Sequence, residues 1–267
     1  MKRVLVCIVA AMVVLMAALG GCGGTATVAT DGSTSMERVI GALGEAFTND
    51  NADIKFTYNP TGSSSGIAAV LAGRCDIGLS SRALKENEIE AGLTETLLAY
   101  DGIAVIVHPD NPVRDLTVEQ IAAIYTGEIV NWSALGGADA QIVVIGREAG
   151  SGTRDGFESI TGTEDSCVYR QELASTGDVV STVSANPAAI GYCSLASVKS
   201  NVAAVSVDGT APSEGAVQSG EYALKRPYML ITRSGEELSA HAALFMQFAT
   251  SGEASGIISA QGAIPVA

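Results

Sequence analysis

The order of apolar and polar positions along the chain follows two alternating periods. Residues 26–30, 53–58 and 142–145 form short apolar or alternating runs, which are typical of β-strands. Residues 39–47 instead carry apolar side chains every three or four positions, as one face of an amphipathic helix does. Strand and helix patterns follow one another along most of the chain. The pattern therefore predicts an α/β fold with parallel or mixed sheets.

Two stretches are candidates for strands that run between two halves of the molecule. Tyr100–His108 is strongly apolar and is followed by Pro109, while Tyr228–Thr232 is an apolar strand late in the chain. Proline cannot donate a hydrogen bond to a neighbouring strand, so Pro109 marks the end of the first stretch. We expect the second stretch to return the chain to the half from which it began.

The first 22 residues differ from the rest and predict a targeting signal rather than a part of the fold. Lys2 and Arg3 precede an almost wholly apolar stretch, residues 4–19, and small residues then lead to Cys22. This resembles a bacterial lipoprotein signal, which implies that residues 1–21 are removed as a signal peptide and that Cys22 carries lipid on its sulfur. The alternative is an uncleaved membrane anchor, although the apolar stretch is at or below the length that spans a bilayer. Both interpretations place the remainder outside the cytoplasmic membrane.

The negative charge of the mature chain argues against some classes of binding partner. Without the two basic residues of the signal, 13 Lys and Arg side chains remain against 29 Asp and Glu, which is a net charge of −16. So acidic a surface repels nucleic acid and anionic lipid at long range. We therefore expect no nucleic-acid partner, and an anion has to be captured by local dipoles and one or two arginines.

The cysteine count leaves the pairing of the thiols open. Cys7 leaves with the signal and Cys22 takes the lipid, so Cys75, Cys167 and Cys193 remain. An odd number of cysteines cannot all pair. A disulfide between Cys167 and Cys193 and a set of three small buried thiols are both compatible with the sequence. We expect no cofactor and no metal site.

A hydroxyl-rich turn recurs at four predicted strand ends. These turns hold Ser33–Ser35, Ser63–Ser65, Ser80–Ser81 and Ser151–Thr153. One such turn is explained by helix capping, because Ser and Thr are preferred N-caps. Four of them in a sheet protein of this size indicate that the strand ends converge on a single small ligand.

The most informative of these turns is Arg147–Arg154, which lies between an apolar strand and a predicted helix. A helix start leaves several backbone N–H groups unpaired at the positive end of its dipole, which suits an anion. Ser151 and Thr153 add hydroxyl donors, and the glycines beside them let the main chain approach a ligand closely. Arg147 supplies a planar, charged guanidinium whose N–H groups can donate to two oxygens of an oxyanion. Taken alone, the stretch also fits a capped helix with a tight turn.

One of the turns raises the alternative of an enzyme. Gly62 to Gly66 matches the G-x-S-x-G pattern of a serine hydrolase, with Ser64 in the nucleophile position. Such an enzyme needs a histidine base, and the chain has only His108, which precedes a proline, and His241, which lies in a helical pattern. We therefore expect a binding protein without catalytic residues and keep an exported serine hydrolase as the less favoured alternative.

Seven segments together are more specific than any one Gly/Ser motif. The motifs are DGSTSM at 31–36, TGSSSGI at 61–67, DIGLSSRAL at 76–84 and REAGSGTR at 147–154, supported by AAIGYCSL at 188–195, SGEYALKRPYMLIT at 219–232 and GAIPV at 262–266. Over nearly the whole mature chain, these segments make it similar to the phosphate-binding proteins of bacterial phosphate ABC importers, which belong to the periplasmic binding protein superfamily.

The resemblance implies a two-lobe fold of the periplasmic binding protein kind (type II). Each lobe would be a mixed sheet flanked by helices, with a ligand cleft between the lobes. Residues 22–102 would form the first part of lobe 1, residues 103–207 lobe 2, and residues 208–267 the segment that returns to lobe 1.

The resemblance also implies which residues hold the ligand. By motif matching, the donors from lobe 1 are Thr34, Ser35, Ser63 and Ser81. Those from lobe 2 are Arg147, Ser151, Gly152 and Thr153. Asp31, Glu148 and Arg82 are the candidates for a supporting or proton-accepting role.

Ser81 departs from the pattern of some family members, which carry an aspartate at this position. That carboxylate accepts a hydrogen bond from protonated phosphate and rejects sulfate, which has no proton to donate. Ser81 can accept a hydrogen bond but lacks a fixed negative charge, and Asp31 or Glu148 is the candidate to stand in. The sequence therefore predicts a receptor for a tetrahedral oxyanion, with phosphate favoured and sulfate or molybdate as alternatives.

The function that the resemblance implies is capture of inorganic phosphate outside the membrane. The receptor, expected to be a monomer, would be anchored by its lipid to the extracytoplasmic face of the cell membrane. It would close its lobes on phosphate and deliver it to a membrane permease with its ATPase. A phosphate sensor that serves a signalling partner remains an alternative.

Overall fold

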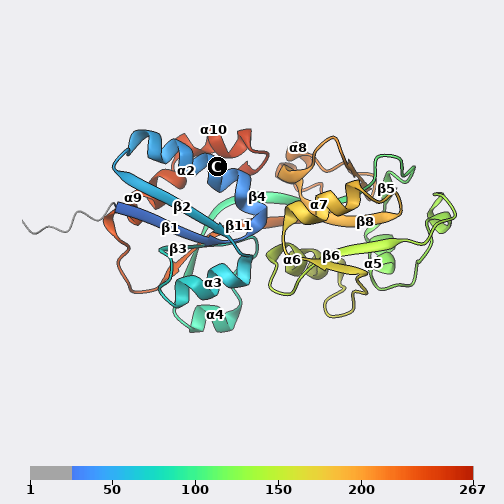
Figure 1. Cartoon of the computed structure of the whole chain (residues 1–267), viewed down its shortest axis with the longest axis horizontal. Helices are drawn as coiled ribbons and strands as arrows, with labels where there is room; N and C mark the ends of the chain where they lie inside the picture. Colours follow the sequence, from blue (N-terminus) through green and yellow to red (C-terminus); the bar gives the residue numbers. More distant parts are fainter. Residues whose placement is uncertain (1–25, 267) are drawn as a thin grey trace, which may run out of the picture.

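The molecule consists of two α/β lobes that lie end to end along its longest axis (Figure 1). The computed structural model describes residues 26–266. The predicted signal peptide, residues 1–21, and Cys22 lie outside the described residues. Within the described residues, no helix is both long and apolar enough to cross a membrane.

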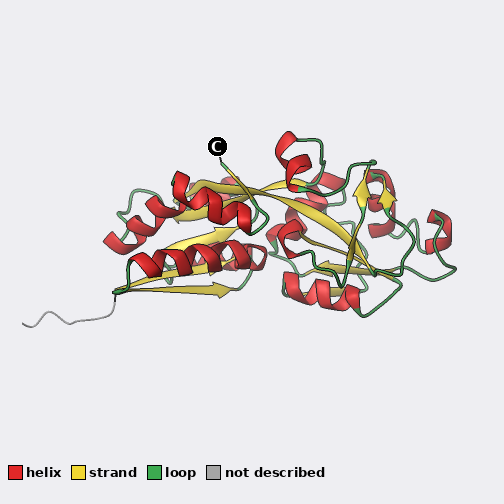
Figure 2. Cartoon of the chain, turned by 90° about the horizontal axis from the view of Figure 1, so that it is seen from above, coloured by secondary structure: helices red, strands yellow, loops and turns green. Residues whose placement is uncertain are grey.

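The first lobe contains elements from both ends of the described chain. The early ones are β1 (Ala26–Gly32), η1 (Thr34–Met36), α2 (Glu37–Asp50), β2 (Ile54–Pro60), α3 (Ser63–Leu71), β3 (Ile77–Ser80), α4 (Glu86–Glu90) and the first part of β4 (Leu93–Val107). The late ones are β11 (Lys225–Arg233), α9 (Ala240–Ala249), α10 (Gly252–Ala260) and β12 (Ile264–Pro265). The helices α2 and α10 lie on one side of the sheet and α3 and α4 on the other (Figure 1), and Figure 2 shows the lobe from above.

The second lobe is formed by the middle of the chain and the end of β4. Its elements are β5 (Asp115–Leu116), α5 (Val118–Tyr125), η2 (Trp132–Leu135), β6 (Val143–Arg147), α6 (Gly152–Thr161), β7 (Gln171–Leu173), α7 (Thr176–Ser184), β8 (Ala189–Ser194), η3 (Leu195–Ser197), β9 (Ala203–Ala204), β10 (Ser206–Val207) and α8 (Glu214–Ser219). The strands β5 and β10 form a small parallel pair apart from the main sheet.

One path of paired strands joins the two lobes, in the order β2-β1-β3-β11-β4-β8-β6-β7. The strands β1, β2 and β3 are parallel, and β11 is antiparallel to both β3 and β4. In the second lobe, β6 is parallel to β7 and β8, while β8 is antiparallel to β4. Both lobes therefore have mixed sheets, which confirms the predicted two-lobe α/β class.

The strand β4 passes from one lobe to the other. Its residues 93–102 pair with β11, and its residues 103–107 pair with β8. At the crossing, the N–H of Ile103 donates to the carbonyl of Leu224 at 2.7 Å, immediately before β11 begins. The expected crossings at Tyr100–His108 and near Tyr228 thus lie side by side, in two adjacent antiparallel strands.

The return segment makes its first contacts with the second lobe, and its helix α8 also packs against β12 of the first. Val217, Tyr222 and Leu224 are buried in the same apolar cluster as Val105. We therefore propose lobe boundaries after Gly102 and after Leu224, the second of which lies later than the expected start of the return at residue 208. The physical reason is that α8 buries an apolar face that its sequence alone does not assign to either lobe.

Each lobe has its own apolar core. In the first lobe, α2 buries Val39, Ile40, Leu43 and Phe47, the positions at helical spacing, and Phe47 meets Phe245 of α9 edge to face at 5.4 Å. Burying one such side chain stabilises the fold by roughly 1.5–3 kcal/mol. The helical period of residues 39–47 is therefore explained by packing against the sheet and α9.

The second lobe packs around an aromatic group. Phe157 of α6 stacks on Tyr192 of β8 with ring centroids 4.2 Å apart, and Tyr125 of α5 lies 4.6 Å from Phe157. Trp132 is buried, and its indole N–H donates to the carbonyl of Ala188 at 2.9 Å. These contacts fix α6, and with it the Arg147–Arg154 turn, against the sheet.

The three cysteines of the described residues are free thiols. Cys75 belongs to a first-lobe cluster and Cys193 to a second-lobe cluster, whereas Cys167 is partly exposed. Burial raises the pKa of the Cys75 thiol to about 11. These thiols are therefore largely protonated at neutral pH and behave as small apolar side chains.

Candidate functional site

Four helix starts meet where the two lobes face each other. They belong to η1 and α3 in the first lobe, and to α6 and α7 in the second. A helix start leaves backbone N–H groups unpaired at the positive end of the helix dipole. Such a region is a ready-made site for an anion. The sequence pattern predicts three of these starts but not the one at α7.

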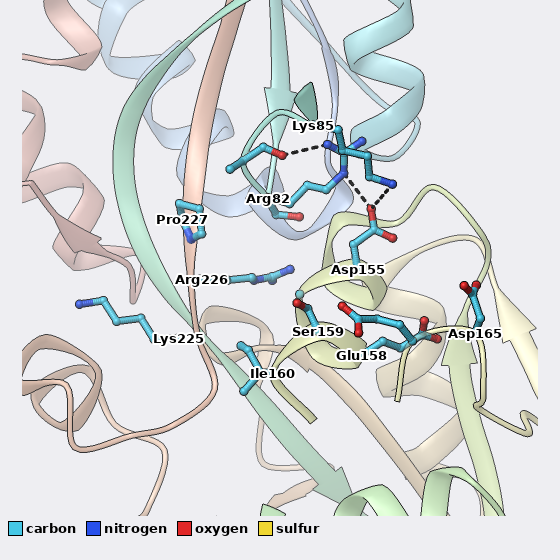
Figure 3. Close-up of a pocket in the computed structure, with 14 residues that line it drawn as sticks. Arg82, Lys85, Asp155, Glu158, Ser159, Ile160, Asp165, Lys225, Arg226 and Pro227 are labelled. Carbon is cyan, nitrogen blue, oxygen red and sulfur yellow. Dashed lines mark hydrogen bonds and ion pairs between the residues drawn. The ribbon is translucent and has the colours of Figure 1, made fainter. Parts of the chain in front are cut away.

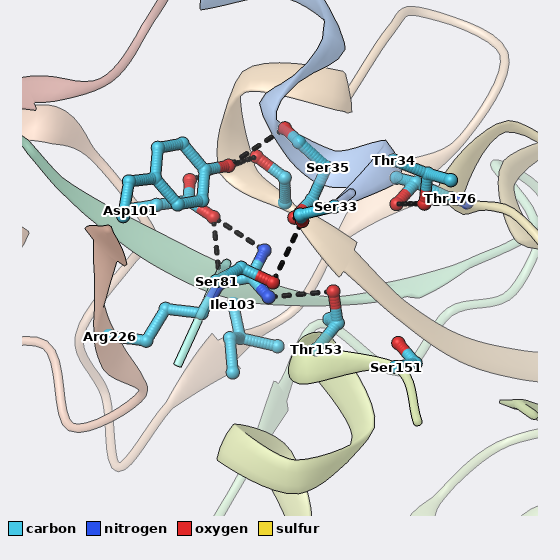
Figure 4. A network of polar contacts seen from close by, with 12 residues as sticks. Ser33, Thr34, Ser35, Ser81, Asp101, Ile103, Ser151, Thr153, Thr176 and Arg226 are labelled. Carbon is cyan, nitrogen blue, oxygen red and sulfur yellow. Dashed lines mark hydrogen bonds and ion pairs between the residues drawn. The ribbon is translucent and has the colours of Figure 1, made fainter. Parts of the chain in front are cut away.

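The hydroxyls of the first lobe form a connected, buried set (Figure 4). The Ser33 hydroxyl is 2.8 Å from that of Ser35 and donates to the Ser81 oxygen at 2.9 Å. The Ser63 and Ser81 oxygens are 3.2 Å apart, and the backbone N–H of Ser81 donates to Ser63 at 3.1 Å. The structure thus brings three of the four hydroxyl-rich turns together, and the fourth joins them from the other lobe.

The second lobe contacts this set directly, so the lobes are closed on each other. The N–H of Ser64, in the first turn of α3, donates to the carbonyl of Gly150 at 3.0 Å. Gly150 has a φ of 88°, a conformation that L side chains rarely adopt. A methyl group added at Gly152 would lie 2.7 Å from the Ser81 oxygen and closer still to that of Ser63. Glycine at position 152 is therefore what allows α6 to approach the first-lobe hydroxyls.

Arg147 is buried at the end of β6, with 2% of its surface exposed. Its Nε donates to the carbonyl of Leu173 at 3.0 Å and its Nη2 to that of Ala174 at 2.8 Å. Its Nη1 donates to the Thr176 hydroxyl at 3.2 Å. Burial lowers the pKa of Arg147 to about 10, so the side chain stays charged at neutral pH.

Thr176 links this arginine to the first lobe. Its hydroxyl oxygen is 3.3 Å from that of Thr34, and its backbone N–H donates to the Thr34 oxygen at 3.3 Å. Both threonines are buried. Arg147 and Thr34, which the sequence predicts on opposite walls of one site, are thus separated by a single hydroxyl group.

Ser151 and Thr153 lie at the start of α6 in Figure 4. Ser151 is the N-cap, and its hydroxyl accepts from the N–H of Arg154 at 3.4 Å. Thr153 accepts a 2.6 Å hydrogen bond from Nη1 of Arg226, a residue that the sequence analysis did not single out. Arg226 in turn forms a buried ion pair with Asp101, at 2.7 Å.

The three supporting candidates lie in different surroundings. Asp31 accepts hydrogen bonds from Asn59, at 2.8 Å, and from the Thr61 hydroxyl, so it orders the loop that leads into α3. Glu148 is exposed, and its backbone N–H donates to the carbonyl of Leu173. Neither carboxylate forms a hydrogen bond with the hydroxyls of Ser33, Ser35, Ser63 or Ser81.

Arg82, the third candidate, joins the lobes. It is 7% exposed, and its guanidinium forms two 2.8 Å hydrogen bonds with Glu88. Its Nε is 2.8 Å from the carboxylate of Asp155 in α6, and its Nη2 donates to the Ser64 hydroxyl at 3.2 Å.

A cavity of about 470 Å³ borders the site (Figure 3). Ser81, Arg82 and Lys85 line it from the first lobe, Asp155 and Glu158 from α6, and Arg226 from β11. Lys85 lies 3.9 Å from Asp155. The cavity therefore lies along the contact between the lobes and reaches the residues that surround the hydroxyl set.

The residues that the sequence analysis missed carried a weak signal. Asp101 and Arg226 are charged residues inside or beside strongly apolar strand patterns, where an unpaired charge is unfavourable. Thr176 follows a capping serine and precedes an acidic residue in the first turn of α7. Nothing in the sequence indicated that these residues would lie beside Thr153 or Thr34.

Two closed lobes joined by crossing strands, with facing helix starts and buried arginines, define the class of solute-binding proteins of the periplasmic kind. Comparison with known proteins agrees with this class. Residues 21–253 match the family model described as the PBP superfamily domain. The phosphate-binding protein PstS of Borreliella burgdorferi is 32% identical over 247 residues, with 88% of each chain covered. That of Bacillus subtilis is 30% identical over 286 residues, which cover 99% of this chain and 94% of the relative.

A solved structure is similar over the whole fold. It is the crystal structure, with bound phosphate, of a protein from Clostridium perfringens described as a phosphate ABC transporter substrate-binding protein. Its TM-score is 0.87 at 41% identity, with 90% of this chain and 100% of that chain covered. The chain therefore belongs to the PBP superfamily and, within it, to the family of the phosphate-binding proteins PstS.

Proposed function

We propose that this protein is an extracytoplasmic receptor that captures inorganic phosphate between its lobes for import by an ABC transporter. The observation that carries the proposal is the meeting of helix starts, hydroxyls and a buried arginine from two lobes in one enclosed place. A tetrahedral oxyanion offers four oxygen atoms in different directions, so donors on both sides of a cleft can hold it. Closure of the lobes would remove it from water.

The proposed ligand residues are those implied by the motifs. They are Thr34, Ser35, Ser63 and Ser81 in lobe 1, and Arg147, Ser151, Gly152 and Thr153 in lobe 2. Support comes from the short distances that link Ser63 with Ser81 and Thr34 with Thr176. The acidic surface gives no long-range attraction for an anion, so affinity has to come from these close donors.

The family supports the choice of phosphate among oxyanions. The PstS relatives are phosphate-binding proteins by name, and the Clostridium perfringens structure holds phosphate. Ser81 presents no carboxylate to reject sulfate, so competition between anions is the sharpest test of the ligand. The chain would deliver phosphate to a membrane permease with its ATPase.

The proposed location follows from the first residues of the sequence. Residues 1–21 would be removed as a signal peptide, and Cys22 would carry the lipid that holds the receptor at the outer face of the cell membrane. Mass spectrometry of the mature protein tests this point, because lipidation adds a diacylglycerol mass to a peptide that begins at Cys22. A peptide that still includes residues 1–21 contradicts it.

We propose a binding role rather than catalysis. The Ser64 hydroxyl accepts a hydrogen bond from Arg82 at 3.2 Å. Of the two histidines of the chain, His108 lies after β4 beside Asp110, and His241 lies in α9. A serine nucleophile needs a base within hydrogen-bond reach, and the neighbour of Ser64 is a charged arginine, which cannot accept a proton.

Calorimetric titration with phosphate, and competition with sulfate and molybdate, tests the proposed function. We expect phosphate to bind in a 1:1 ratio and, because Ser81 supplies no carboxylate to reject sulfate, an excess of sulfate to compete measurably but more weakly than phosphate. Tighter binding of sulfate or molybdate would move the assignment to another oxyanion. Failure of every anion to bind the folded protein would overturn the receptor function.

A further inference from the structure

A buried ion pair lies on the two strands that cross between the lobes. Asp101 of β4 is fully buried, and Arg226 of β11 is 2% exposed. The Nη2 and Nε atoms of Arg226 donate to Oδ2 of Asp101 at 2.7 and 3.0 Å. Desolvation of two charges opposes folding, so an ion pair at this depth is weak evidence for stability. The buried Arg226–Asp101 pair is better explained by a role that requires the guanidinium of Arg226 to stay in one position.

The third guanidinium nitrogen of Arg226 reaches the start of α6. Its Nη1 donates to the Thr153 hydroxyl oxygen at 2.6 Å. A guanidinium can only donate, so the Thr153 oxygen is the acceptor in this contact. The one hydroxyl hydrogen of Thr153 is then left for another acceptor. Thr153 is the second residue of α6, in the turn whose N–H groups open toward the first lobe.

The rest of the network ties this arginine to both lobes (Figure 4). The other oxygen of Asp101 accepts from the Ser194 hydroxyl of β8 at 2.9 Å. Ser194 lies 2.9 Å from the Tyr228 hydroxyl, which donates to the carbonyl of Ser35 at 2.8 Å. The guanidinium is therefore positioned by β4, and the network around it touches the hydroxyl turn of each lobe.

We propose that Arg226 is a positioning residue for phosphate, an inference that rests on the proposed function. Held in plane by Asp101, it engages the Thr153 oxygen and so orients the Thr153 hydroxyl hydrogen toward a ligand oxygen. Without this contact the hydroxyl is free to rotate and to present its oxygen lone pairs to the anion. Lysine cannot replace Arg226, because an ammonium lacks the planar fork that pairs with Asp101 and reaches Thr153 together.

A cycle of variants at Arg226 and Thr153 tests the inference by phosphate calorimetry on the full chain. Arg226→Lys keeps the positive charge beside Asp101, and thermal unfolding followed by circular dichroism checks that each variant folds. We expect Arg226→Lys to weaken phosphate binding about tenfold or more, the effect of one charge-assisted hydrogen bond. The same loss is expected in a Thr153→Ser background, which keeps the hydroxyl. In a Thr153→Val background, Arg226→Lys should change the affinity by less than about twofold.

The Thr153→Val background distinguishes positioning of the Thr153 hydroxyl from a general loss of stability. If Arg226→Lys lowers the affinity equally in all three backgrounds, the inference is overturned, since Arg226 then acts on stability or on the anion itself. An unchanged affinity of the Arg226→Lys variant overturns it as well. Arg233→Lys is the matched control, because Arg233 is on the same strand and pairs with the exposed Glu236. If the unaltered protein does not bind phosphate, the proposed function fails before the cycle begins.

Discussion

At the scale of single residues, the hydrogen bonds that a polar side chain already makes determine how it can meet a ligand. Arg147 donates to two carbonyls and to Thr176, so its plane is fixed before a ligand arrives. Such a fixed donor loses little conformational entropy on binding. The same logic applies to Ser81, whose oxygen already accepts from Ser33.

Arg147→Ala should weaken phosphate binding by at least about 100-fold, because it removes a buried charge and the partner of Thr176. Calorimetric titration measures the loss, and circular dichroism checks that the lobes remain folded. Arg170→Ala is the control, since Arg170 is an exposed arginine of the same lobe. An affinity equal to that of the unaltered protein would remove Arg147 from the site.

The low pKa of Arg147 predicts a pH dependence of binding. Burial lowers the pKa from 12.5 to about 10, so the ligand-free protein loses this charge as the pH rises through about 10. A bound anion favours the charged form, and binding above that pH therefore takes up a proton. We expect phosphate affinity to fall above about pH 10. Equilibrium dialysis with labelled phosphate measures it, and Arg147→Ala should lack this fall.

At the scale of elements, the site is a property of helix starts rather than of whole helices. Thr34, Ser63, Gly152 and Thr176 are each the first residue of a helix. Two of these starts reach the other lobe through their N–H groups, because the N–H of Ser64 donates to the carbonyl of Gly150 and that of Thr176 donates to the Thr34 oxygen. The approach of α6 to α3 is close enough that Gly152 leaves no room for a side chain.

Gly152→Ala should interfere with closure while leaving each lobe folded, because alanine is a good helix former and the added methyl group would meet the Ser63 and Ser81 oxygens. We expect phosphate affinity to fall about tenfold or more with little change in the unfolding temperature. Calorimetry and circular dichroism report the two quantities. Gly256→Ala in α10, where an added methyl group meets nothing within 4 Å, is the control. Normal binding by Gly152→Ala would show that the lobes do not need this approach.

At the scale of the whole molecule, the lobes are held closed by contacts outside the hydroxyl set. Arg82 of the first lobe pairs with Asp155 of α6 at 2.8 Å. Farther along the interface, Arg38 of α2 donates to the carbonyl of Ala196 in η3 at 2.6 Å. A ligand that binds between the lobes shifts the balance toward the closed arrangement, and these contacts add to that shift.

Asp155→Asn should destabilise the closed arrangement, because it removes the charge that faces Arg82. We expect phosphate to dissociate several-fold faster, with a smaller effect in high salt, since Asp155 is partly exposed. Stopped-flow dissociation measures the rate, and X-ray scattering with and without phosphate reports closure. Glu236→Gln breaks an exposed ion pair within one lobe and is the control. An unchanged dissociation rate would mean that the Arg82–Asp155 pair does not contribute to closure.

The sequence by itself determined the elements and their capping turns. The strand at residues 26–30, the helix at 39–47 and the glycine-hydroxyl turns follow from local periodicity and local turn chemistry, which act over a few residues. The motifs at 31–36 and 147–154 also indicated the family. Local rules therefore reached the fold class and the types of donor.

Only the tertiary structure decided which of these residues meet. Thr34 and Thr176 are 142 positions apart, and Asp101 and Arg226 are 125 positions apart. Their contacts depend on the register of β4 against β8 and β11 and on closure of the lobes. Because a side chain's sequence neighbours do not encode such long-range pairings, the partner of Asp101 and the meeting of α7 with Thr34 could be found only in the folded molecule.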